Sequence, residues 1–172
     1  HHSPFFNFAD EYILKPIPIE EWTPYFSERL SAVHVHLSKP ALQKILELSM
    51  NVPNTICEIG SYIQEHYKNK KLEEDHILKI IDELIDAKSE GFQFQIKQLS
   101  KAEQKVLYAF SINRYTAEIQ GKDLQNKTNL SLSGIKKTIT KLYHLGIVEE
   151  ENNLYRTSNP LLALYLLKNK IV

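Results

Sequence analysis

The chain has 172 residues, which is enough for one large or two small domains. Its 42% hydrophobic and 24% charged residues are typical of a globular protein with an ordinary core, and no apolar run approaches the ~18 residues of a membrane span. No signal peptide is visible, and the single cysteine, Cys57, excludes an intramolecular disulfide and fits a reducing cytoplasm.

The formal net charge of zero conceals an asymmetry between the two halves. Residues 1–99 contain 10 Lys and Arg against 15 Asp and Glu, whereas residues 100–172 contain 11 against 6. A basic region joined to an acidic one favours a polyanionic partner for the C-terminal half.

The first 18 residues predict a tail that leads into one short strand. That strand, Tyr12–Leu14, is followed closely by Pro16 and Pro18. A lone strand needs a sheet to join, and the next eighty residues offer none. We therefore expect the strand to be the last one of a domain that is absent here, so that the chain is a fragment of a longer protein.

Between Ile19 and Gly91 the apolar residues recur at helical spacing and predict a bundle of four helices without strands. Trp22, Phe26 and Leu30 are expected to line the inner face of the first helix. The other three helices are expected to follow Ser38, to run from Asn54 to Tyr67, and to run from Glu74 to Lys88. Gly91 should end the last helix, and 92–99 should form an apolar connector.

Residues 99–160 have the pattern of a winged helix-turn-helix. Ser100 and Glu103 form a capping box at the start of a first helix, and a short second helix is expected over 122–128. After a third helix, two extended runs, Ile147–Glu149 and Leu154–Thr157, flank an Asn-containing turn and predict a β-hairpin, the wing.

The third helix has the composition of a DNA recognition helix. Ser131 suits its N-cap, Gly146 suits its end, and four apolar residues at helical spacing predict its inner face: Leu132, Ile135, Ile139 and Leu142. The other side carries hydroxyls, lysines and a histidine, and no carboxylate. In a major groove the first turn meets base edges while cations meet phosphates. The candidate DNA-binding residues are Ser131, Ser133, Lys136, Lys137, Thr140, Lys141 and His144.

Protein contact remains an alternative for this helix. Lysine-rich outer faces are often only solvated, and the wing carries three consecutive carboxylates, Glu149–Glu151, which would face phosphates in a minor groove. The second reading is therefore a winged helix that serves as a protein-interaction or oligomerisation module.

The expected fold class is mainly α: a four-helix, lid-like bundle followed by a winged helix-turn-helix with a small β-hairpin wing. The expected divisions are a tail with one strand (1–18), the bundle (19–91) and the winged helix with its C-terminal helix (92–172). That last helix, Pro160–Asn169, is apolar on nearly every side, so it should be buried against another element.

Several short motifs occur in a familiar order: S-P-F-F-N-F-A-D-E-Y-I-L-K-P-I near the start, then the helix with Trp22, then N-V-P, and finally S-N-P-L-L-A-L-Y-L. This order resembles the C-terminal part of a family of archaeal and bacterial AAA+/STAND-type ATPases. The resemblance implies a P-loop core followed by a helical lid and a winged helix. It also implies that ATP or ADP is bound through a core domain absent from this chain, and that the parent protein is an ATPase.

The resemblance carries two positions over to this chain. In the family, a glycine-x-proline turn begins a lid helix and its proline approaches the nucleotide base. Here Asn51 replaces the glycine and Pro53 matches, and Asn is among the residues that best tolerate a positive φ. Asn51 and Pro53 are thus the candidate cofactor-binding residues, although a proline that only starts a helix explains Pro53 equally well.

No catalytic residue is expected in this chain. None of its five glycines belongs to a G-x-x-x-x-G-K-[S/T] sequence, so a phosphate-binding loop is missing and the chain alone should not hydrolyse ATP. His34 and His36 lack a third ligand nearby, so no metal site is expected.

Overall fold

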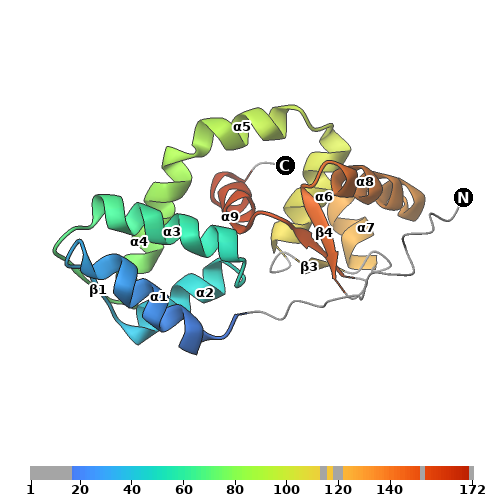
Figure 1. Ribbon diagram of the computed structural model, residues 1–172. Coiled ribbons are helices and arrows are strands. Elements are labelled where there is room, and N and C mark those ends of the chain that lie inside the picture. The colour runs from blue at the N-terminus through green and yellow to red at the C-terminus, as the bar shows by residue number, and fades with distance from the viewer. Residues whose placement is uncertain (1–16, 113–115, 118–121, 152–153, 171–172) are drawn as a thin grey trace, which may run out of the picture.

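The computed structural model describes residues 17–112, 116–117, 122–151 and 154–170, and these residues are mainly α-helical. The predicted strand Tyr12–Leu14 lies outside them. Figure 1 shows two units side by side, an N-terminal unit (residues 17–97) and a C-terminal unit (residues 99–170). The mainly α fold with a small hairpin that the sequence predicts is confirmed.

The N-terminal unit contains five helices, which are α1 (Ile19–Ser31), α2 (Lys39–Leu48), α3 (Pro53–His66), α4 (Glu74–Ala87) and α5 (Ser89–Lys97). Trp22, Phe26 and Leu30 are buried on the inner side of α1, as predicted. Helices α1 and α3 approach closely at Gly60, where an added Cβ would lie 3.0 Å from the Phe26 ring. Glycine at this position therefore permits the contact.

A short pair of strands in this unit contradicts the prediction of a strand-free bundle. Strand β1 (His36–Leu37) pairs in parallel with β2 (Lys71–Leu72). The His36 N–H donates to the Lys70 carbonyl at 2.9 Å, and the Ser38 N–H donates to the Leu72 carbonyl at 3.0 Å. Two residues are too few to show a period of two in the sequence, and it is the packing of the helices that brings these loops together.

The region predicted as a connector is also helical. Gly91 lies within α5 instead of ending the preceding helix, and Phe92 and Ile96 of α5 are buried. A glycine inside a helix costs about 0.5–1 kcal/mol relative to alanine. Burial of two large apolar side chains outweighs a cost of that size.

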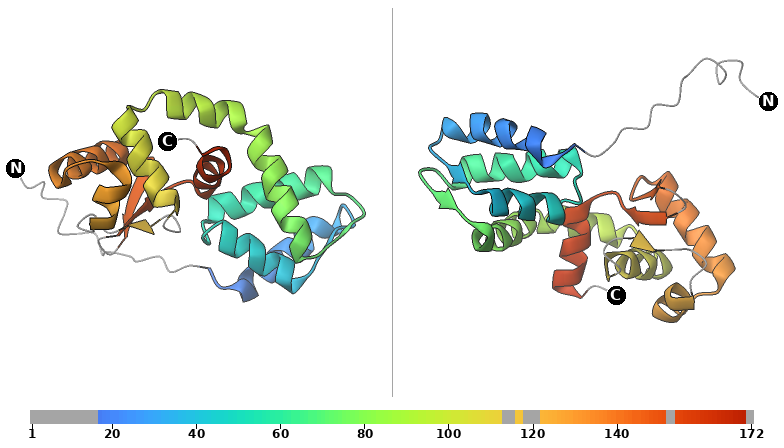
Figure 2. Two further views of the ribbon diagram at one scale, coloured as in Figure 1. Left: turned by 180° about the vertical axis from the view of Figure 1, so that it is seen from behind. Right: turned by 90° about the horizontal axis from the view of Figure 1, so that it is seen from below.

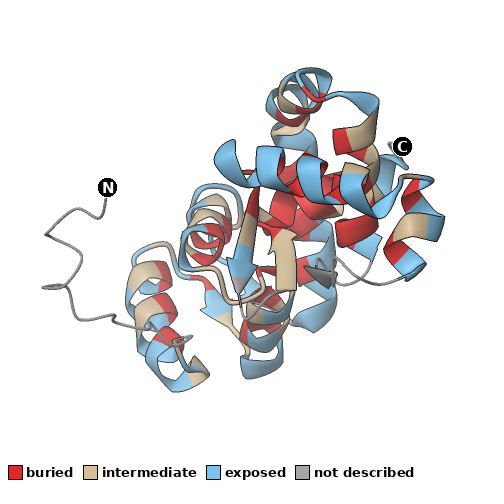
Figure 3. Cartoon of the chain, turned by 90° about the vertical axis from the view of Figure 1, so that its right-hand side faces the viewer, coloured by how far each residue is buried: buried red, intermediate tan, exposed pale blue. Residues whose placement is uncertain are grey.

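The C-terminal unit contains the remaining elements, which are α6 (Lys101–Ile112), β3 (Thr116–Ala117), α7 (Lys122–Thr128), α8 (Leu132–His144), β4 (Val148–Glu151), β5 (Leu154–Thr157) and α9 (Pro160–Asn169). The strands form an antiparallel sheet in the order β3-β5-β4. The hairpin β4–β5 lies where the sequence predicts a hairpin, whereas the sequence pattern does not predict β3. Figure 3, which views the molecule from the side of this unit, shows buried residues gathered beneath the exposed helix surfaces.

Helix α9 lies between the two units (Figures 1 and 2). The Asn159 side chain caps it by accepting hydrogen bonds from the Leu161 and Leu162 N–H groups at 3.0 and 3.3 Å, and Pro160 occupies its first position. This is a strong helix start, because the cap satisfies two free donors and proline has none to satisfy.

The contacts of α9 join the units on both sides. It packs against α6 and β5 of its own unit and against α4 and α5 of the other. The rings of Phe92 and Tyr165 lie 5.4 Å apart, and the Lys168 ammonium lies 3.2 Å from Asp82 and 2.7 Å from Asp86 of α4. The prediction that this apolar helix is buried against other elements is confirmed.

Candidate nucleic-acid interface

Helix α8 lies on the side of the C-terminal unit that is remote from the N-terminal unit (Figures 1 and 2). It follows α7 after a tight turn in which Asn129 has a φ of 58°. The Ser131 hydroxyl caps α8 by accepting the Gly134 N–H at 3.2 Å. After the helix, Gly146 has a φ of 68°, a conformation that suits glycine. The predicted N-cap and end of this helix are both confirmed.

The inner side of α8 is built from Ile135, Ile139, Leu142 and Thr138, all of which are buried. The sequence also predicts Leu132 on this inner side, but 36% of the residue is exposed. At 100° per residue, Leu132 lies at the edge of the apolar stripe and away from its centre, which explains the difference.

The outer side of α8 carries cations and hydroxyls. Ser133, Lys136, Lys137, Thr140 and His144 are all exposed, and no acidic residue lies within α8. Lys136 and Lys137 form no ion pair with any residue that the structure describes. The Thr140 hydroxyl donates to the Lys136 carbonyl at 3.0 Å and still has lone pairs to accept with.

Lys141 has a partner, unlike the other two lysines of α8. Its ammonium lies 2.6 Å from Oε1 of Glu103 on α6, a side chain that is only 4% exposed. The other oxygen of Glu103 accepts the Ser100 N–H at 2.6 Å, and the Ser100 hydroxyl accepts the Glu103 N–H at 3.4 Å. The predicted capping box is therefore confirmed, and one of its members also holds α8.

The environment of Glu103 favours its charged form. Burial by itself would raise the pKa of this carboxyl, but the Lys141 ammonium and the hydrogen bonds from Ser100 outweigh it and hold the pKa below its usual value. The sequence reveals the capping box but not this pair, because 38 positions separate the two side chains.

The hairpin beside α8 is acidic and internally paired. Oε1 of Glu149 accepts from Nε of Arg156 across the hairpin at 2.5 Å. Burial together with the neighbouring Glu150 carboxylate raises the pKa of the Tyr155 hydroxyl. The predicted acidic wing therefore offers little attraction for phosphates, which leaves α8 as the basic part of this surface.

The two candidate nucleotide contacts lie in the turn between α2 and α3. Asn51 has a φ of 54°, which fits its place in the resemblance, and both ends of its amide are in use. Its oxygen accepts from Nε1 of Trp22 at 3.2 Å, and its nitrogen donates to the Ile17 carbonyl at 3.0 Å. Pro53 is the first residue of α3 and is exposed.

The residues that the structure describes contain no group of three or more His, Cys, Asp or Glu side chains that could hold a metal ion. His34 and His36 are both exposed. None of the described helices combines the length and apolar character that a membrane crossing requires.

Comparison with known proteins gives a structural likeness but no match to a family profile or a curated protein. Among solved structures, the Walker-type ATPase Paby2304 of Pyrococcus abyssi is similar, with a TM-score of 0.64 and 13% sequence identity. The match covers 88% of this chain and 42% of that one, so the chain spans less than half of the length of that ATPase. The likeness supports an ATPase-related fold.

Proposed function

We propose that this chain is the helical lid and winged-helix region of a Walker-type ATPase, and that α8 binds duplex DNA. The structural likeness to a Walker-type ATPase over most of the chain supports the first part. The succession of α6, α7 and α8, a tight turn before α8 and a hairpin after it supports the second. In a helix-turn-helix of this kind, the last helix enters the major groove.

The observation that carries the DNA proposal is the outer side of α8. Lys136 and Lys137 are exposed cations without an ion partner among the described residues, and the helix that bears them contains no carboxylate. Such cations bind phosphates by displacing counterions. Ser133 in the first turn is neutral and exposed, as suits a group that reaches base edges.

For the nucleotide, we propose that ATP or ADP is bound by a core domain and meets this chain at the turn before α3. Asn51 shapes this turn, because both ends of its amide already bind Trp22 and Ile17. The exposed ring of Pro53 is then the part that approaches the base.

A second candidate function is protein contact through the same helix. Three large apolar side chains at the two ends of α8 are exposed, Leu132 by 36%, Tyr143 by 50% and Leu145 by 54%. Exposed apolar side chains next to the acidic hairpin are more useful to a protein partner than to a DNA backbone.

The salt dependence of duplex binding distinguishes the two functions. Fluorescence anisotropy with random duplex DNA measures the binding constant K between 50 and 200 mM salt. The plot of log K against log salt falls, and the double substitution K136A/K137A should make it less steep by about 1.8, since each phosphate contact contributes about 0.9 to the steepness. A matched control is K68A/K70A, which removes two exposed lysines that have no ion partner among the described residues and lie between α3 and β2.

The K68A/K70A control should bind duplex DNA with the same salt dependence as the unsubstituted chain (the parent). If K136A/K137A binds duplex with an unchanged slope, α8 is not the DNA-binding helix. In that case, weaker binding of a protein partner by L132A/Y143A than by the unsubstituted chain would favour protein contact, the second candidate function.

A further inference from the structure

The Glu103–Lys141 pair has a consequence for the proposed DNA interface. We infer that Glu103 is a positioning residue, whose carboxylate holds the Lys141 ammonium against α6 and keeps it out of phosphate contact. Helix α8 then presents two phosphate-binding lysines, Lys136 and Lys137, instead of three. This inference rests on the proposed binding of DNA by α8.

The geometry of the pair separates Lys141 from its neighbour Lys137, one helical turn earlier. The two side chains lie on the same side of α8, because residues four apart share a helix face. Lys137 has no ion partner among the described residues, whereas Lys141 lies 2.6 Å from Glu103. The Lys141 side chain is 61% exposed, so it is the carboxylate and not burial that withholds it from DNA.

The carboxylate cannot move away with its charge intact. Its second oxygen is fixed by the Ser100 N–H at 2.6 Å, and the side chain is 4% exposed. A phosphate that bound Lys141 would have to draw the ammonium from Glu103 and leave a buried carboxylate without its cation, which is strongly unfavourable. Together the two groups carry no net charge, so the pair releases no counterion when DNA arrives.

Removing the buried negative charge of Glu103 should therefore strengthen DNA binding by the surface of α8. E103Q keeps an oxygen that can accept the Ser100 N–H but removes the charge that holds Lys141. The freed lysine should add one phosphate contact and steepen the salt slope by about 0.9. Between 50 and 200 mM salt, this corresponds to an additional affinity loss of about threefold to fourfold.

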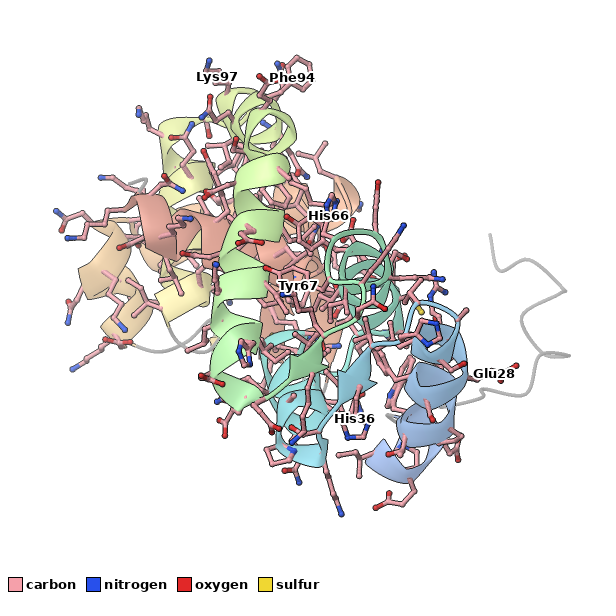
Figure 4. All side chains as sticks on the ribbon, turned by 90° about the vertical axis from the view of Figure 1, so that its left-hand side faces the viewer. Glu28, His36, His66, Tyr67, Phe94 and Lys97 are labelled. Carbon is pink, nitrogen blue, oxygen red and sulfur yellow. The ribbon has the colours of Figure 1, made fainter. Side chains whose placement is uncertain are left out.

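The experiment measures salt slopes with random duplex DNA for four variants of the whole chain. K141A should keep the slope of the parent, E103Q should steepen it, and E103Q/K141A should return to the parent value. A charge-matched control is E28Q, which changes the net charge equally at an exposed residue of α1 in the N-terminal unit (Figure 4). This control should leave the slope unchanged.

Each outcome decides the matter. A slope that falls by about 0.9 in K141A, or that stays unchanged in a folded E103Q, overturns the inference. If K136A/K137A lowers the slope at the same time, the proposed function survives that result. If K136A/K137A does not lower it, or the parent does not bind duplex, both fail. Circular dichroism establishes folding, and if E103Q does not fold, K141A and K141M decide.

Discussion

Helices α4 and α8 are nearly equal in length and treat their charges in opposite ways. Each buries an apolar stripe against its own unit. All lysine and carboxylate side chains of α4 except Asp75 lie within ion-pair distance of an oppositely charged group of the chain, the pairs being Glu74–Lys44, Lys79–Glu83, Asp82–Lys168 and Asp86–Lys168. On α8 only Lys141 has such a partner, whereas Lys136 and Lys137 have none among the described residues.

The difference separates charges that belong to the fold from charges that are directed outward. Four of the five carboxylates of α4 lie within ion-pair distance of a lysine of the chain, and two of them, Asp82 and Asp86, share Lys168 of α9. Lys136 and Lys137 of α8 are exposed and have no ion partner among the described residues, and unpaired surface cations suit a polyanion. The following predictions test whether the two helices differ only on their outer faces.

The largest effects are expected from the inner faces, where the helices should behave alike. Ile80 of α4 and Ile135 of α8 are both fully buried. I80A and I135A should each lower the free energy of unfolding by about 2–5 kcal/mol, the usual cost of such a truncation in a core. Urea unfolding followed by circular dichroism measures both changes.

Leu78 provides the control, since it lies on α4 and 58% of it is exposed. L78A should change stability by about 0.5 kcal/mol or less, as surface substitutions do. If I135A lowers the free energy of unfolding by as little as L78A does, α8 is not held by its apolar stripe and does not resemble α4 on its inner face.

A smaller effect should separate two lysines of the same helix. K141A leaves the buried Glu103 carboxylate without its cation, so it should lower the free energy of unfolding by about 1–3 kcal/mol. K136A removes an exposed lysine that has no ion partner among the described residues, and should cost about 0.5 kcal/mol or less. Equal urea midpoints for K141A and K136A would show that the pair adds no stability.

The sequence predicts the parts of this fold that depend on neighbouring residues. The capping box of Ser100 and Glu103, the cap at Ser131 and the glycine stop at Gly146 are all local signals, and all three are confirmed. The stripe of α1 and the hairpin β4–β5 are likewise present where the spacing predicts them.

What the sequence does not predict depends on residues that meet only after folding. The pair β1–β2 joins loops 35 positions apart, and α5 is stabilised as a helix by packing that outweighs its glycine. At the candidate interface, the composition of α8 identifies a basic face. Only the structure shows that one of the three lysines of α8, Lys141, forms an ion pair with Glu103. Long-range pairing of charges leaves no periodic signal in a sequence.

The stability of the chain should depend on pH through the Glu103 carboxylate. The pKa of Glu103 is lowered in the folded chain, so the unfolded chain binds this proton more readily. The stability that Glu103 contributes is therefore present above the ordinary carboxyl pKa of about 4.3 and is lost as the pH falls through the lower folded value. The stability difference between the parent and E103Q should accordingly narrow on acidification.

Urea unfolding at a series of pH values from 7 to 3 measures this narrowing. E28Q, at an exposed carboxylate of α1, gives the background change for loss of one negative charge. A difference between the parent and E103Q that stays constant down to pH 3 would show that the carboxylate contributes no pH-dependent stability.

The smallest effect concerns the charges that join α4 to α9. Lys168 lies 3.2 Å from Asp82 and 2.7 Å from Asp86, but all three side chains are partly exposed. K168A should therefore lower the free energy of unfolding by only about 0.2–1 kcal/mol at low salt. In 1 M salt the screening length is about 3 Å, so most of this difference should disappear. Urea unfolding at both salt concentrations measures it.

The double substitution D82N/D86N removes the same attraction from the other side, so adding K168A to it should cost almost nothing more. A loss in K168A that persists in 1 M salt would contradict the electrostatic explanation. It would instead indicate that the aliphatic part of Lys168 packs between the units, as long cationic side chains often do. In that event the contact between α4 and Lys168 of α9 would depend on apolar packing and not on charge. The two helices α4 and α8 would then differ less than their ion pairs suggest.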